Sequence, residues 1–191
     1  MERRTLWAIG TFVVAALIMI IVAASLGTAP KQVTELQHPA IQQFGGIAER
    51  HDIHERPDPR AEYRVIFDVT SSPEDTRALN AGLDRVARAV NIFADAGVPL
   101  DQLHFVAIIH GKATHSILND DTYQEWYDTK NPNSALIEAL TKAGVEVAVC
   151  GQSLNHLHVK DEEVNPDVVI APSALSTLAI YGNRGYAYER L

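Results

Sequence analysis

The sequence predicts an α/β fold: a three-layer sandwich built around a mostly parallel sheet of about five strands. Apolar runs of strand length alternate along the chain with amphipathic stretches of helical period. Glycine follows several of the helical stretches, where a left-handed residue commonly ends a helix. The run 103–109 is almost continuously apolar, as expected for a central strand covered on both faces.

The first strand and helix are predicted from residue 63 onward. The run 63–69 is rich in β-branched and aromatic residues, which favours a strand. In the segment 72–75, Ser, Pro and Asp suit the N-cap, N1 and N3 positions, so we expect a helix to begin there. Gly97 should end it. Its apolar stripe consists of Leu79, Leu83, Val86, Val90 and Phe93.

The second and third cycles follow the same order. The apolar strand 103–109 leads into His110-Gly111, and Asp120-Asp121 is expected to open a helix, where acidic side chains favour the positive end. Asn131-Pro132 opens the next helix, Gly144 ends it, and 145–149 is the following strand.

The last cycle completes the predicted sheet. The run 168–171 reads as a strand, Pro172-Ser173 leads a helix, and 185–188 forms a short terminal strand. In open parallel sheets, ligands bind beyond the carboxyl ends of the strands. His110-Gly111, Cys150-Gly151 and Pro172-Ser173 all follow such ends, so we expect a crevice there.

The amino-acid composition limits the kinds of molecule that the chain is expected to bind. The chain has 191 residues and a formal charge of −8, with 16 basic and 24 acidic side chains. A nucleic-acid-binding surface normally carries basic residues that neutralise phosphates, so we expect no nucleic-acid partner. The single cysteine, Cys150, excludes an intramolecular disulfide and a four-thiolate metal site.

Three segments are predicted along the chain. Residues 1–29 form a transmembrane anchor or signal peptide, because about 22 uncharged residues follow Arg3-Arg4 and suffice to cross a bilayer. The paired arginines favour a cytoplasmic amino terminus and a domain on the exported side, periplasmic or extracellular. Cleavage would instead give a secreted protein. Residues 30–62 read as a polar linker or arm that Phe44 and Ile47 pin to the domain, and 63–191 form the α/β domain.

Cys150 is the principal candidate for chemistry. If a helix begins near Ser153, amide donors and the helix dipole favour a thiolate, which is the reactive form. Gly151 leaves room for a partner to approach, and Gln152 and Ser153 can donate hydrogen bonds. The alternative is a buried structural cysteine, since an unpaired cysteine is among the most buried residue types.

His110 is the next candidate, because a histidine at the neighbouring strand end is placed to orient or protonate a group near Cys150. Asp68, late in the first strand, is the most interesting carboxylate. His115, His156 and His158 are weaker candidates, and a zinc or copper site made of histidines and Cys150 is a further alternative without diagnostic spacing. The histidines of the arm, His51 and His54, read as surface residues.

No cofactor is expected. No P-loop or G-x-G-x-x-G pattern occurs, so nucleotide binding is disfavoured. Asn119 and Asn133 are expected to line the same crevice as Gly111 and Gly151.

From Tyr63 to Leu191 the chain resembles the DsrE/DsrF-like sulfur-relay family, which includes YchN-like proteins. The order and spacing of several segments carry the resemblance: 65–69 with its following helix, 106–111, 131–133, 144–153 and 185–186. The resemblance implies a three-layer α/β fold, assembly into trimers or hexamers, and in several members a persulfide on one cysteine. Cys150 matches that position.

These observations favour a membrane-anchored, envelope-facing domain in which Cys150 carries sulfur as a persulfide or responds to thiol oxidants. Whether it turns over as an enzyme is left open. The donor or acceptor is another protein or a small thiol, because the chain has no second cysteine. The first alternative is a non-enzymatic module that binds a small ligand or a partner through the crevice. The second is histidine-based metal binding.

Overall fold

Five parallel strands form the sheet at the centre of the structure, which is a computed structural model describing residues 35–191. The strands are β1 (Tyr63–Val69), β2 (Leu103–Ile109), β3 (Glu146–Cys150), β4 (Val169–Ala171) and β5 (Ala187–Arg190). Their order across the sheet is β4-β3-β2-β1-β5. The α/β prediction with a parallel five-stranded sheet is therefore confirmed, and all five carboxyl ends lie at one edge.

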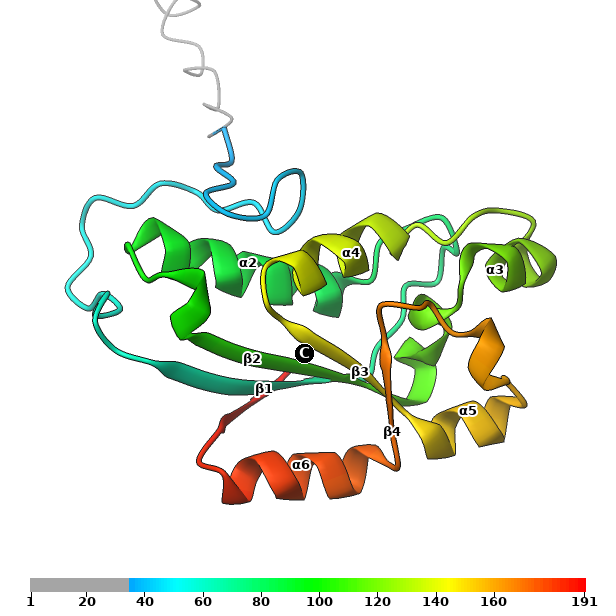
Figure 1. The fold of residues 1–191 in the computed structure, drawn as a ribbon. Coiled ribbons are helices and arrows are strands. Elements are labelled where there is room, and N and C mark those ends of the chain that lie inside the picture. The colour runs from blue at the N-terminus through cyan, green and yellow to red at the C-terminus, as the bar shows by residue number, and fades with distance from the viewer. Residues whose placement is uncertain (1–34) are drawn as a thin grey trace, which may run out of the picture. The chain divides into compact units, whose positions relative to one another are not determined.

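Helices cover both faces of this sheet (Figure 1). The helices α2 (Ala81–Asp95) and α4 (Ser134–Lys142) lie on one face, and α6 (Ala174–Asn183) lies on the other. Two further helices of the described residues lie beyond the carboxyl edge: α3 (Asp120–Tyr127) follows the segment after β2, and α5 (Gly151–Leu157) begins directly after β3. Short 3-10 turns span Leu100–Gln102, Gly111–Ile117 and Asp161–Glu163.

Alternating strand residues divide the core in two. Phe67, Phe105 and Val147 belong to the larger buried cluster, which packs against α2 and α4. Ile66 and Val106 point to the opposite face and join a smaller cluster beneath α6. Because side chains alternate along a strand, each residue's parity fixes which cluster it joins.

The first helix begins later than the sequence predicts. Residues 72–75 precede a turn, and α2 begins at Ala81 with Asn80 as its N-cap. The Asn80 side chain accepts hydrogen bonds from Gly82 N–H and Leu83 N–H and donates to Ser71 O and Ser116 Oγ. These contacts make Asn80 the better cap, so the prediction that Ser72 caps this helix is wrong.

The other predicted helix boundaries agree more closely with the structure. Asn119 caps α3 at its predicted start, Ser173 caps α6, and Gly97 and Gly144 follow helices with positive φ angles. One helix, α5, begins directly after Cys150 rather than at Ser153.

Part of the predicted arm packs on α2, and Leu36–Leu191 form one compact unit. Ile41 and Ile47 are buried and Phe44 packs against the larger cluster. The buried Asn91 of α2 accepts hydrogen bonds from Ala40 N–H and Ile41 N–H at 3.0 and 2.8 Å. Its amide donates to the carbonyls of Ile41, Phe44 and Gly45. This part of the arm therefore adds a further layer outside α2.

The predicted amino-terminal anchor, residues 1–29, lies outside the described residues. Within residues 35–191, no helix combines the length and apolar character needed to cross a bilayer.

Candidate functional site

Three polar side chains stand at the carboxyl ends of neighbouring strands, on the face that α6 covers. Asp68 lies near the end of β1, His110 directly follows β2, and Cys150 ends β3. Asp68 shares its face with Ile66, and Cys150 shares its face with Ala148. His110 has extended backbone angles (φ −155°, ψ 179°) and donates its N–H to Val69 O, so it continues the pleat of β2.

Asp68 and His110 form a close pair. The His110 Nε2 atom lies 2.7 Å from Asp68 Oδ1, and Tyr188 Oη of β5 lies 2.6 Å from Asp68 Oδ2. An ionised carboxylate only accepts hydrogen bonds, so His110 Nε2–H and Tyr188 Oη–H are the donors. Asp68 is 6% exposed. Its hydrogen bond raises the pKa of the Tyr188 hydroxyl, because a negative charge beside the phenol disfavours its ionisation.

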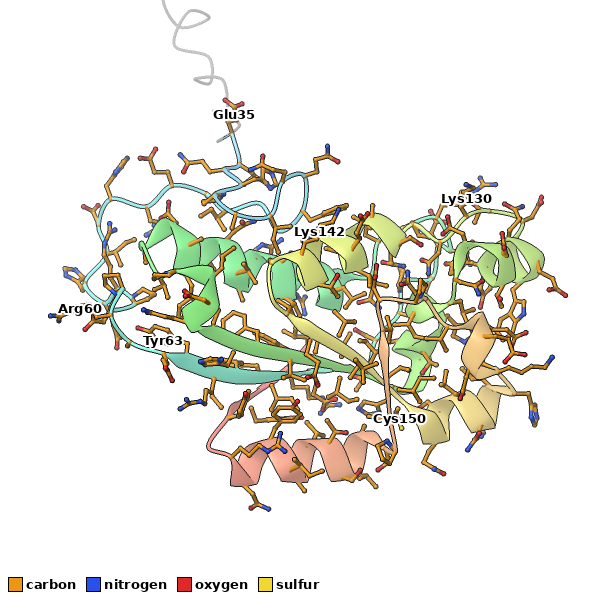
Figure 2. All side chains as sticks on the ribbon, viewed as in Figure 1. Glu35, Arg60, Tyr63, Lys130, Lys142 and Cys150 are labelled. Atoms are coloured by element: carbon orange, nitrogen blue, oxygen red, sulfur yellow. The ribbon has the colours of Figure 1, made fainter. Side chains whose placement is uncertain are left out.

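The Cys150 sulfur lies where two helices begin. Figure 2 places Cys150 at the junction of β3 and α5, close to the start of α6. Burial raises the pKa of its thiol, but hydrogen bonds to the sulfur outweigh this effect. The largest comes from the Ala174 N–H of α6, and further ones come from Ser153 Oγ–H, Ser153 N–H and Gln152 N–H of α5. The net effect lowers the pKa of Cys150 below its ordinary value, which favours the thiolate.

Ser153 connects the loops that carry His110 and Cys150. Its hydroxyl contributes to the lowered pKa of Cys150 and accepts a hydrogen bond from Gly111 N–H at 3.3 Å. Gly111 follows His110 with a φ of +60°, a value that favours glycine. The turn after β2 is thus held against the first turn of α5.

Gly151 keeps its neighbours close. A Cβ atom built at this position would lie 3.0 Å from Ala171 O, so a side chain would push β4 away from the start of α5. The Gln152 side chain donates a long hydrogen bond of 3.4 Å to Pro172 O, directly after β4. Both residues therefore contact the segment that joins β4 to α6.

A pocket of about 420 Å³ opens beside these residues. It is lined by Gly111, Lys112, His115, Gln152, Ser153, His156 and Leu157. Its walls come from the turn that follows β2 and from α5, and His110 and Cys150 are not themselves among the residues that line it. The volume suits a small molecule or the tip of a partner chain.

His115 has its own network. Its Nδ1 atom is hydrogen-bonded to Tyr127 Oη, and its ring packs edge-on against Trp126. Burial lowers the pKa of the His115 imidazole, because the charged form loses hydration. His115 also borders a second pocket of about 300 Å³, whose wall includes Tyr123 and Asn133.

The structure gives other predicted site residues structural roles. Asn119 caps α3 by accepting from Thr122 N–H, and Asn133 accepts from Asn80 N–H while almost fully buried. Neither lines the pocket beside Gln152 and Ser153. In the described part of the chain, no three histidine, cysteine, aspartate or glutamate side chains converge as a metal site would require.

Two contributors to the site were missed at the sequence level. Tyr188 bonds Asp68 only because β5 pairs with β1, and Ala174 reaches the Cys150 sulfur only because α6 begins beside β3. A tyrosine in the last strand was the only available signal, and it did not indicate which edge of the sheet that strand would join.

A family model described as the DsrE/DsrF-like family matches residues 64–188. Among solved structures, MTH1491 from Methanobacterium thermoautotrophicum, a protein of unknown function, is 18% identical with a TM-score of 0.53. The match covers 68% of this chain and all of MTH1491. The YchN protein from E. coli is 17% identical with a TM-score of 0.49, over 68% of this chain and 99% of YchN. No curated protein matches the sequence.

Proposed function

Because the chain belongs to the DsrE/DsrF-like family, we propose that it is a sulfur carrier that holds a persulfide on Cys150. One observation carries this proposal: Cys150 ends β3 directly before α5, and N–H groups at the starts of α5 and α6 lower the pKa of its thiol. These donors stabilise a negative charge on sulfur, whether that sulfur belongs to a thiolate or to a persulfide.

The proposed transfer balances without an added oxidant. The Cys150 thiolate attacks the outer sulfur of a donor persulfide, the S–S bond of the donor breaks, and the donor leaves as a thiolate. An acceptor thiolate then attacks the outer sulfur on Cys150 and releases the Cys150 thiolate. The acceptor is a separate molecule, since Cys150 is the only cysteine.

Intact mass spectrometry of the full chain tests the carrier function. After incubation with polysulfide and removal of excess reagent, we expect a gain of about 32 Da per sulfur atom that dithiothreitol reverses. Cys150→Ala should show no gain. An unmodified native chain, or equal labelling of Cys150→Ala, would contradict the proposal.

A second candidate function has one observation in its favour. Cys150 is 6% exposed and packs with Ile66, Val106 and Ile108, as a structural cysteine would. A non-enzymatic module would then bind a small ligand or partner in the pocket beside Ser153. Wild-type binding by Cys150→Ser, together with an inert thiol, would favour this function over the carrier.

We propose that a second copy of the chain covers the outer side of β4 and α6. Large apolar side chains are exposed there: Leu175 is 84% exposed, Val169 54% and Ile180 47%. Isolated exposed apolar residues are common, but several on one edge strand and its adjoining helix favour an interface. This assembly would follow the trimers or hexamers of the family.

Sedimentation of the full chain tests the assembly. We expect a trimer or hexamer for the native chain and dissociation for Leu175→Asp. Ile92→Asp, which alters an exposed residue of α2 on the opposite side of the sheet, is the matched control and should leave the mass unchanged. A monomeric native chain would overturn this proposal.

We further propose that residues 5–26 anchor the chain in a membrane, with the α/β domain on the exported side. The uncharged segment after Arg3-Arg4 supports this location. Membrane fractionation with protease digestion of intact cells should find the full chain in the membrane and its domain accessible from outside. Recovery in the soluble fraction at full mass would contradict it.

A further inference from the structure

The order of the polar groups at the carboxyl edge is the starting observation. Asp68, His110 and Cys150 follow one another across β1, β2 and β3, on one face. A carboxylate, an imidazole and a thiol in this order form an arrangement in which the imidazole exchanges protons with sulfur and the carboxylate orients it. Sheet register, rather than nearness in sequence, creates this order.

The position of Asp68 is unusual for a carboxylate. Its neighbours on the same face, Ile66 and Ile108, are buried and apolar, and a carboxylate placed among them loses hydration. A residue that only filled space there would be apolar. The carboxylate is instead bonded by two donors, His110 Nε2–H and Tyr188 Oη–H, which fix its direction.

The hydrogen bond to Asp68 sets the tautomer of the neutral His110 imidazole. Since His110 gives its Nε2 proton to the hydrogen bond with Asp68, the neutral ring carries its lone pair on Nδ1 and accepts a proton there. The His110 side chain is 30% exposed, so an incoming thiol can reach it, whereas Asp68 is covered.

We propose that His110, oriented by Asp68, carries the proton in sulfur transfer at Cys150. This inference rests on the proposed carrier function. When the donor persulfide loses its outer sulfur to Cys150, the His110 imidazolium gives its proton to the departing thiolate. When the acceptor thiol arrives, the His110 imidazole takes its proton, and the resulting thiolate attacks the outer sulfur on Cys150. The proton that His110 gives to the donor thiolate is replaced by the proton of the acceptor thiol, and the outer sulfur moves from the donor to the acceptor. His110 and Cys150 therefore return to their starting states.

In this scheme Asp68 is a positioning residue, and Tyr188 holds Asp68 in place. Several elements carry other charged or titratable groups around the site, so the pH profile of the native chain must be compared with those of variants. These groups are Cys150 at the end of β3, Arg190 of β5, which pairs in register with Asp68, and Lys112 and His156, which line the neighbouring pocket.

The experiment measures two rates on the full chain between pH 5.5 and 9.5. The first is transfer of sulfur from glutathione persulfide through Cys150 to a thiol acceptor. The second is alkylation of Cys150 by iodoacetamide, which requires a thiolate but no proton for its leaving group. The variants are His110→Gln, His110→Ala and Asp68→Asn, with His158→Asn as a control at the exposed end of α5.

We expect His110→Gln to slow transfer by about 100-fold near neutral pH and to flatten its pH profile, with alkylation unchanged. Asp68→Asn should slow transfer less, by about 10-fold, and shift the profile. Free imidazole should partly restore sulfur transfer in His110→Ala, because it can carry the proton in place of the missing side chain. This rescue is possible only if the rest of the site is folded. The control should transfer at the native rate.

The outcomes separate the two proposals. If the native chain forms no persulfide, the carrier function fails and His110 has no proton to carry. If the native chain transfers sulfur and His110→Gln matches its rate and pH profile, only the role of His110 is overturned. Equal losses of transfer and alkylation, without imidazole rescue, would make His110 a support of the local fold and would also overturn it.

Discussion

The two faces of the central sheet differ in how they are covered. Within residues 35–191, the face beneath α2 and α4 belongs to a cluster of 26 buried apolar residues, while the face beneath α6 belongs to a cluster of six. Asp68 and Cys150 stand on the second face, and both have polar partners. We conclude that the large cluster supplies most of the apolar packing. The smaller face can therefore hold polar groups that make specific hydrogen bonds.

Two adjacent isoleucines of β2 test this comparison most directly. Ile109 faces the large cluster and Ile108 the small one, and both are fully buried. We expect Ile109→Ala to lower the free energy of unfolding by about 4 kcal/mol and Ile108→Ala by about 2 kcal/mol, because the thin layer beneath α6 collapses more easily around a cavity. Urea denaturation measures both values. Equal losses would show that the two faces contribute alike.

The layer that the arm adds over α2 is the next test. Asn91→Leu removes five hydrogen bonds to residues 40–45 and leaves backbone groups without partners. We expect a loss of about 3 kcal/mol in the free energy of unfolding, with faster proteolysis of the arm. The exposed Asn155→Leu serves as a control in another helix and should change stability little. An intact, protease-resistant arm in Asn91→Leu would mean that apolar contacts alone hold it.

On the face beneath α6, the ionisation of Cys150 should make a smaller contribution to the free energy of unfolding, and this contribution depends on pH. Its pKa is lowered in the folded chain, so the folded state binds fewer protons than the unfolded state. The resulting stability is present in full above the unfolded pKa of about 8.5 and is lost as pH falls through the folded value. The free energy of unfolding of the native chain should therefore rise with pH relative to Cys150→Ser. A constant difference across this range would show that the thiolate is not favoured.

The smallest effect is expected on the outer side of α6. Leu175→Ala changes a side chain that is 84% exposed and should alter the free energy of unfolding of the dilute protomer by less than about 0.5 kcal/mol. Thermal unfolding at the lowest usable concentration measures this. A loss above 1 kcal/mol would place Leu175 in the fold of the single protomer.

The strands were predictable because their signals are local. The apolar runs of β1, β2 and β3 are continuous in the sequence, and parallel strands bring their carboxyl ends to one edge. This reasoning was enough to place His110 and Cys150 at the same edge of the sheet. It could not reveal the bond between Asp68 and Tyr188, whose residues are 120 positions apart and meet only through the pairing of β1 and β5.

The start of α2 shows the limit of local signals. The segment 72–75 carries residues that suit a helix start, yet such residues also suit turns. Asn80 prevails because its backbone N–H bonds to Asn133 Oδ1 and its side chain bonds to Ser116 Oγ, both far along the chain. A cap that is chosen by tertiary contacts cannot be identified from a window of ten residues.

The pairing of β5 with β1 also has a consequence for biosynthesis. β1 is the first strand of the domain to leave the ribosome and β5 is the last. The carboxylate of Asp68 therefore cannot accept its hydrogen bond from Tyr188 until nearly the whole domain has been translated. A nascent chain that has already packed α2 against β1 and β2 therefore still has an unpaired β1 edge. Such an edge can recruit a strand from another chain, so chaperone binding during synthesis would protect the sheet at this position.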